Sequence, residues 1–128
     1  MNQVTKILSL LIMLSVSQLG TSQIRMEAFK DKNFTEIQSM LLSDVTVKID
    51  SNKKIEGNAE SMAAIKKTLN SFSPIKMEMK HKGTSAKNED NYMIAKFFNA
   101  QNETLRVFIH LENTSGGKKI CDLRIRHS

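Results

Sequence analysis

Apolar and charged side chains alternate in the stretch KKICDLRIR, which runs from Lys118 to Arg126. A period of two is typical of a β-strand that has one face in the core and the other in water. The apolar positions are Cys121, Leu123 and Ile125. We therefore expect a final strand whose charged row, including Arg124, lies on the opposite face of the sheet.

Residues 75–81 and 105–111 show the same alternation, and residues 92–98 are apolar on nearly both sides, as in a central strand that is covered on both faces. The links between the four segments are short and polar (TSAKNEDN, NAQNE and NTSGG), as in antiparallel neighbours joined by turns. The sequence therefore predicts a four-stranded antiparallel meander. The rows expected to face the core are Ile75, Met77, Met79 and His81; Leu105, Val107, Ile109 and Leu111; and Cys121, Leu123 and Ile125.

The chain before Pro74 has mainly helical periodicity. We expect a short helix over residues 24–31, a second over 34–41 that is capped by Asn33 with Glu36, and a third over 58–72. A strand over 45–49 and a short one around Ile55 lie between the last two helices. The predicted fold is α+β: about three helices cover one face of a curved antiparallel sheet, made of the four-strand meander plus N-terminal strands.

The first 22 residues have the layout of a secretory signal peptide. Lys6 precedes an apolar run over residues 7–16, which is too short to span a bilayer, and small residues lead to an expected cleavage after Ser22. We predict a signal peptide at 1–22, one domain at 23–128, and no membrane span after cleavage. Cys121 is the only cysteine, so no intrachain disulfide can form, and this favours a secreted protein of the bacterial periplasm.

The element order and the pattern HKGT…NYMIAKFF…TLRVFIHL…GGKKICDLRIR resemble a family of small exported Bacteroidota proteins, the DUF4783 family of unknown function in the nuclear transport factor 2-like superfamily. The similarity runs from about Phe29 to Arg126. The resemblance implies a cone-shaped fold in which helices and a bent sheet enclose a pocket. That superfamily includes isomerases, dehydratases and epoxide hydrolases, and also domains that only bind or dimerise, so the fold does not choose the function.

The expected pocket is almost free of acid–base groups. Superfamily isomerases use a carboxylate base in an apolar cavity, and no acidic residue lies on the predicted inward rows. We therefore assign no catalytic residue, cofactor or metal ligand and expect a small apolar ligand, with His81 and Tyr92 as a polar corner of the pocket. An isomerase- or hydrolase-type enzyme is the alternative. The predicted pocket residues are Met77, Met79, His81, Tyr92, Val107, Ile109 and Leu123.

The charged rows of the meander surround Phe108 on the opposite face. The whole chain carries a net charge of +6, but Glu78, Glu112 and Asp122 interrupt the basic row, and a nucleic-acid surface usually has a denser stripe and several stacking aromatics. We expect no nucleic acid partner, and either a solvated face or the contact of a homodimer or another protein partner. The predicted contact residues are Arg106, Phe108, Ile120 and Arg124.

Overall fold

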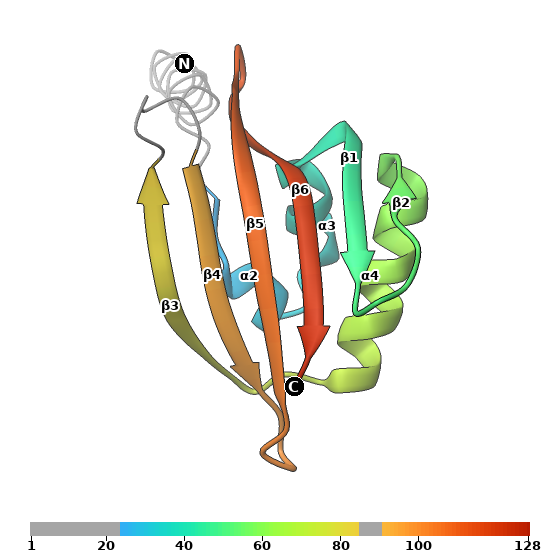
Figure 1. Cartoon of the computed structure of the whole chain (residues 1–128), viewed down its shortest axis with the longest axis vertical. Coiled ribbons are helices and arrows are strands. Elements are labelled where there is room, and N and C mark those ends of the chain that lie inside the picture. The colour runs from blue at the N-terminus through green and yellow to red at the C-terminus, as the bar shows by residue number, and fades with distance from the viewer. Residues whose placement is uncertain (1–23, 85–90) are drawn as a thin grey trace, which may run out of the picture.

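The computed structural model describes residues 24–84 and 91–128, with the backbone alone for 81–84. The described residues form a six-stranded sheet in the order β2-β1-β6-β5-β4-β3, with helices on one face only (Figure 1). The helices are α2 (Glu27–Lys30), α3 (Phe34–Met40) and α4 (Asn58–Phe72). The strands are β1 (Leu41–Ile49), β2 (Ile55–Glu56), β3 (Lys76–Thr84), β4 (Asn91–Phe98), β5 (Thr104–Thr114) and β6 (Gly117–His127). The predicted α+β fold with a curved sheet is confirmed.

Helix α3 begins where its capping residue predicts. The side-chain oxygen of Asn33 accepts a hydrogen bond from the backbone N–H of Glu36 (3.1 Å), and this satisfies one of the free donors at the helix start. The Glu36 carboxylate accepts two hydrogen bonds from Arg25, at 2.7 and 2.9 Å. These bonds lower the pKa of Glu36 and tie the chain before α2 to the first turn of α3.

Helix α4 has one buried face and one charged face. Met62, Ile65, Leu69 and Phe72 are buried, whereas Lys66 and Lys67 are exposed. The helix is preceded by Gly57, whose φ of 95° and ψ of 151° favour glycine, and it ends at Ser73 in the left-handed conformation directly before Pro74. Both boundaries agree with the sequence prediction.

The four-strand meander is confirmed, and the N-terminal strands extend it at the β6 edge. Strands β3 to β6 pair antiparallel in sequence order, but β1 pairs parallel with β6, in contrast to the wholly antiparallel sheet that we expected. The connection from β1 to the rest of the sheet passes through α4, and a crossover of this length permits parallel pairing. Strand β2 closes the far edge through an antiparallel pairing with β1.

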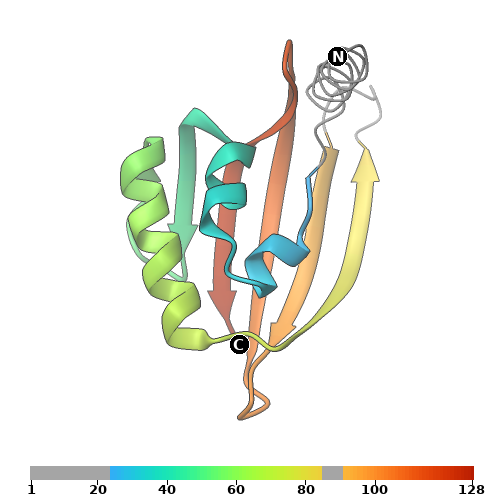
Figure 2. The same ribbon diagram turned by 180° about the vertical axis from the view of Figure 1, so that it is seen from behind.

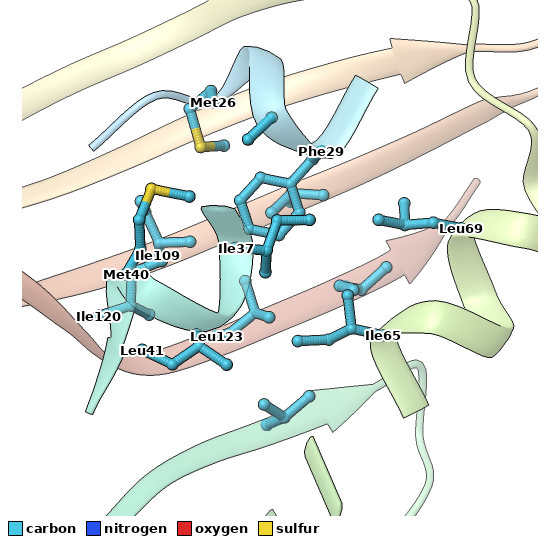
Figure 3. Packing of buried hydrophobic residues seen from close by; sticks show 14 of the residues in the cluster. Met26, Phe29, Ile37, Met40, Leu41, Ile65, Leu69, Ile109, Ile120 and Leu123 are labelled. Carbon is cyan, nitrogen blue, oxygen red and sulfur yellow. The ribbon is translucent and has the colours of Figure 1, made fainter. Parts of the chain in front are cut away.

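One contiguous core lies between the helices and the inner face of the sheet. Figure 2 shows α4 and α3 over the β1–β6 side of the sheet and the short α2 beyond them, with β3 at the opposite edge. Figure 3 shows Phe29, Ile37 and Ile65 of the helices packed against Ile109 and Leu123 of the strands. The helices do not cover the β3 edge of the sheet, where Ile75 is 63% exposed. The predicted burial of Ile75 is wrong because this residue precedes the first residue of β3.

None of the described helices is both long and apolar enough to cross a membrane. The predicted signal peptide, residues 1–22, lies outside the described residues.

Candidate functional site

The apolar row predicted to line a pocket is divided between the core and the sheet edge. Val107, Ile109 and Leu123 lie on the inner face as predicted, and each has an exposed fraction of 0%. A side chain with no accessible surface borders no space that could admit even a water molecule. At the β3 edge Met77 is half-buried and Met79 is 42% exposed. Of the predicted pocket residues on this face, only these two methionines present accessible surface in the described part of the chain.

Tyr92 lies on the opposite face from the predicted pocket. It alternates with Met93 and Ala95, which are buried on the inner face, and it pairs across the strands with His110. Its ring is stacked on that of Phe108, with centroids 6.2 Å apart and planes inclined by 25°. The placement of Tyr92 in an inner pocket is therefore wrong, because the parity of β4 directs it to the helix-free face.

The side chain of His81 lies outside the described residues. Its backbone is described, and the register of β3 shifts between Met79 and His81, so that His81 pairs with Ile94. A regular ladder from Met79 opposite Ala95 would instead have paired His81 with Met93. A β-bulge of this kind changes the parity of all later residues in the strand. The predicted row Met77–Met79–His81 therefore does not continue in register.

A second register shift overturns the prediction for Ile120. Leu111 pairs with Ile120 and the preceding His110 pairs with Asp122, so Cys121 is an extra residue on β6. Ile120 is completely buried and lies in the core near Met40 and Ile109 (Figure 3), and it is not on the outer face. Leu123 and Ile125, which follow the bulge on β6, face inward as predicted. The extra residue reverses only the faces of the residues that precede Asp122.

The same bulge removes Cys121 from the buried row. Cys121 is half-buried, and its Sγ atom lies 3.4 Å from the backbone oxygen of His110 and 3.6 Å from the Nδ1 atom of the same residue. The prediction that Cys121 faces the core is wrong for the reason that displaces Ile120. The thiol instead contacts His110 of the neighbouring strand β5.

The outer, helix-free face of the sheet carries the other predicted contact residues. Phe108 is half-buried in the middle of β5, and Arg106 and Arg124 are exposed beside it. Together with Arg126 and Ser128 they line a pocket of about 390 Å³. We call these five residues the arginine pocket. Phe108, Arg106 and Arg124 thus lie on the face that the alternating pattern predicts.

Strand pairing brings the charges of the arginine pocket together. Arg106 lies directly opposite Arg126, and Phe108 directly opposite Arg124, across the β5–β6 ladder. Arg124 reaches Asp122 of its own strand, with Nε to Oδ2 at 3.4 Å. The backbone N–H of Ser128 donates to the Thr104 oxygen at 3.1 Å, and the hydroxyl groups of these two residues are also hydrogen-bonded. The end of the chain is thereby held beside the start of β5.

Aromatic and basic side chains continue from the arginine pocket across β4. Two lysine ammonium groups lie over the ring of Phe98: Lys76 Nζ is 5.2 Å and Lys96 Nζ is 5.6 Å from the ring centroid. Tyr92 and Ile94 lie farther along the same row of β4 and are half-buried. The outer face therefore combines partly exposed apolar surface with a predominantly basic surrounding.

A histidine–carboxylate pair joins the ends of β1 and β6. The backbone N–H of His127 donates to Asp50 Oδ1 and its ring Nδ1 lies near Asp50 Oδ2, each at 2.8 Å. The backbone hydrogen bond is the main reason that the pKa of Asp50 is lowered, and the charge of Arg126 adds to it. The His127 ring meets Phe72 of α4 edge-on at 6.1 Å. This pair anchors the last turn of α4 to the sheet.

The predicted contact residues omitted two members of the arginine pocket. Arg126 was expected on the same outward row as Arg124, but it was not included among the contact residues. Ser128 has no signal in the sequence, since it follows the last strand and reaches the pocket only through its bonds to Thr104. Among the described residues, no group of three His, Cys, Asp or Glu side chains lies close enough together to hold a metal ion.

Comparisons with known proteins identify the family. A family model for a domain of unknown function (DUF4783) matches residues 22–126. A DUF4783 family protein from Bacteroides ovatus is 15% identical with a TM-score of 0.72, and the match covers 86% of this chain and 97% of that one. One from Bacteroides uniformis is 20% identical with a TM-score of 0.70, covering 80% and 93%.

A more distant similarity defines the fold. A nuclear transport factor 2-like protein of unknown function from Pseudomonas putida is 11% identical with a TM-score of 0.62, and the match covers 79% of this chain and 77% of that one. No curated protein matched the sequence. The chain belongs to the DUF4783 family, a family with members in Bacteroides, and its domain has the nuclear transport factor 2-like fold.

Proposed function

We propose that this domain is a noncatalytic binding module that holds a protein partner on the helix-free face of its sheet, centred on Phe108. The observation that carries the proposal is the arginine pocket: a hollow of about 390 Å³ with an aromatic residue among three arginines. Aromatic residues and arginine are enriched where proteins contact each other, and they account for much of the binding energy there. The neighbouring Tyr92 and Phe98 enlarge the apolar part of this surface.

The inner face offers less support for the alternative, a small apolar ligand enclosed by the helices. Val107 and Ile109 have no accessible surface, so a ligand would have to displace core side chains to reach them. Close-packed cores resist such insertion. Met77 and Met79 are accessible, but they lie on the edge strand β3 and not on the central strands beneath the helices.

The buried polar side chains of the core support a noncatalytic role. Among the described residues, the buried polar side chains are Ser61 and Asn99, and neither is an acid or a base. Asn99 is occupied in a turn, where its oxygen accepts from the backbone N–H groups of Gln101 and Glu103. A buried carboxylate in an apolar cavity, which isomerase chemistry of this superfamily type would need, is not among them.

Site-specific photo-crosslinking tests the proposal. A photoreactive phenylalanine analogue replaces Phe108 in the full chain, expressed in a Bacteroides host. The matched control carries the same analogue at Lys67, an exposed position on the helix layer. We expect a protein adduct of defined mass from position 108 and none from position 67, with the partner identified by mass spectrometry. The proposal is wrong if position 108 gives no adduct, or if the two positions give the same adducts.

Crosslinking also separates two kinds of partner. An adduct of twice the mass of the chain means that a second copy occupies the face, as in the homodimer that is one of the alternatives drawn from the sequence. Sedimentation velocity over a range of concentrations then checks this, because a Phe108-centred dimer must dissociate when Phe108 is replaced by glutamate.

A further inference from the structure

We propose that the arginine pocket binds carboxylate groups of an acidic segment on the protein partner, with an adjacent apolar side chain of that segment on Phe108. This inference rests on the proposed function, since it names the chemistry of the partner that occupies the same face. Three guanidinium groups and one hydroxyl line the pocket, and no acidic residue does. Guanidinium groups match carboxylates with paired hydrogen bonds in a fixed fork, and this geometry favours arginine over lysine at carboxylate sites.

The register of β5 and β6 leaves an unfavourable charge arrangement in the free protein. Arg106 and Arg126 are directly opposite each other, and like charges in directly opposite positions destabilise a sheet. A solvated face would be more stable with an acidic residue at either position. A carboxylate placed between the two guanidinium groups would turn this repulsion into two attractions. The arrangement is thus unfavourable for the isolated domain and favourable for its complex with an anion.

The nearby acids of the chain interact mainly with other residues, although the charge of Arg126 also lowers the pKa of Asp50. Asp122 reaches Arg124 and accepts a hydrogen bond from Thr46, and Asp50 is engaged by His127. In the described part of the chain, neither Arg106 nor Arg126 forms an ion pair. Both residues line the arginine pocket, where none of the lining side chains is acidic, so they can pair with a carboxylate from outside.

Phe108 adds an apolar requirement to the preference of the pocket for negative charge. Phe108 lies directly opposite Arg124 and is stacked on Tyr92, so partly exposed apolar side chains of β4 adjoin the pocket. A volume of about 390 Å³ has room for a few side chains. The best occupant is therefore an extended segment in which an acidic residue and an aromatic or large apolar residue are two positions apart. Residues at this spacing point to the same face of an extended peptide, so both can reach the outer face of the sheet.

Charge also decides against a second copy as the occupant. In a two-fold symmetric dimer the same patch of each subunit faces itself. A dimer centred on Phe108 would place the three arginines of one subunit against the three of the other. An acidic partner avoids this repulsion and gains attraction, which speeds association and makes it sensitive to salt.

Binding of defined peptides tests the inference. The probes are a short fluorescent peptide in which glutamate and phenylalanine alternate at every second position, with serine between them, and its counterpart with glutamine in place of glutamate, both amidated at the C-terminus. Fluorescence anisotropy is measured with the mature domain and with Arg106→Gln, Arg126→Gln and the control Lys67→Gln, which removes the same charge from the helix layer. We expect the glutamate peptide to bind more tightly than the glutamine peptide and to be released by salt.

Each arginine variant should weaken binding of the glutamate peptide by about fivefold, the upper end of what one exposed ion pair contributes, whereas Lys67→Gln should not. Equal binding of the two peptides, or equal loss in all three variants, overturns the inference. Thermal unfolding gives a second readout. Arg106→Gln removes the repulsion from Arg126, so its melting temperature should equal or exceed that of the wild type, and a clear decrease contradicts the repulsive arrangement.

The two proposals fail separately. A position-108 adduct together with equal binding of the two peptides leaves the protein-binding face in place and removes its acidic specificity. Selective binding of the glutamate peptide without any adduct supports a carboxylate site and removes the proposed function. A concentration-dependent dimer that is abolished by Phe108→Glu overturns the acidic partner in favour of a second copy.

Discussion

The hydroxyl group of Ser61 is buried in α4 without a hydrogen-bond partner among the described residues. A buried polar group that has lost water and gained no partner destabilises a protein by about 1–3 kcal/mol. Alanine has the higher helix propensity and needs no partner. We expect Ser61→Ala to raise the free energy of unfolding by about 1 kcal/mol, measured by urea denaturation with an unchanged m value.

Ser71→Ala is the matched control for this variant. Ser71 is exposed near the end of the same helix, so its replacement changes helix propensity and leaves burial unaffected. Its effect should be smaller, about 0.5 kcal/mol or less. If Ser61→Ala is no more stabilising than Ser71→Ala, the hydroxyl group of Ser61 is not a net cost to the fold.

At the scale of elements, the start of α4 depends on one backbone conformation. Gly57 precedes the helix with φ 95° and ψ 151°, a region that is essentially restricted to glycine, and its N–H donates to the Val45 oxygen at 2.9 Å. An added Cβ would meet no atom within 4 Å, so any cost of Gly57→Ala is a backbone cost. We expect this variant to lower the free energy of unfolding by about 1–3 kcal/mol in urea denaturation.

Gly116→Ala provides the comparison. Its added Cβ would lie 3.9 Å from Thr114 Oγ1, an ordinary contact, and Gly116 is not among the glycines with positive φ. This variant should change stability by less than about 0.5 kcal/mol. Equal effects of the two substitutions would mean that the conformation at Gly57 is not what supports the helix start.

Elements and faces were predictable from the sequence as far as the periodicity was unbroken. The alternation placed Arg106, Phe108 and Arg124 on the outer face, and the Asn33 cap and Pro74 gave helix boundaries. The predictions failed at the bulges, which displaced Ile120 and Cys121. No glycine or proline lies within the stretch KICDL, so the extra residue has no local signal there, and only pairing with β5 and β1 reveals it.

At the scale of the whole molecule, the parallel β1–β6 pairing joins the helix layer to the meander. This pairing connects residues more than seventy positions apart, such as Val47 and Leu123, and the sequence carries no local signal for a contact of that range. The arginine pocket depends on it indirectly, because β6 lies between β1 and β5 and presents Arg124 and Arg126 to the outer face. The residues of the pocket were thus predictable to a large extent, whereas its hollow shape required the assembled sheet.

Leu123 lies in the middle of the β1–β6 pairing, and its substitution tests how much this pairing contributes to stability. It is opposite Val47 on one side and Ile109 on the other, with an exposed fraction of 0%, and it packs under the helices. Leu123→Ala leaves a cavity where both halves of the fold meet, so we expect a loss of about 2–5 kcal/mol. In a domain of this size such a loss lowers the melting temperature by at least about 8 °C, as a single transition by circular dichroism.

Met79→Ala is the contrasting variant, since Met79 was predicted to line the same pocket. Its exposed fraction is 42%, at the β3 edge, so its truncation removes few core contacts and should change the free energy of unfolding by less than about 1 kcal/mol. If Leu123 instead bordered an open ligand cavity, its truncation would enlarge a space already present, and the two variants would have similar small effects. A large difference between them therefore supports a solid inner face, and favours the helix-free face as the location of the proposed binding surface.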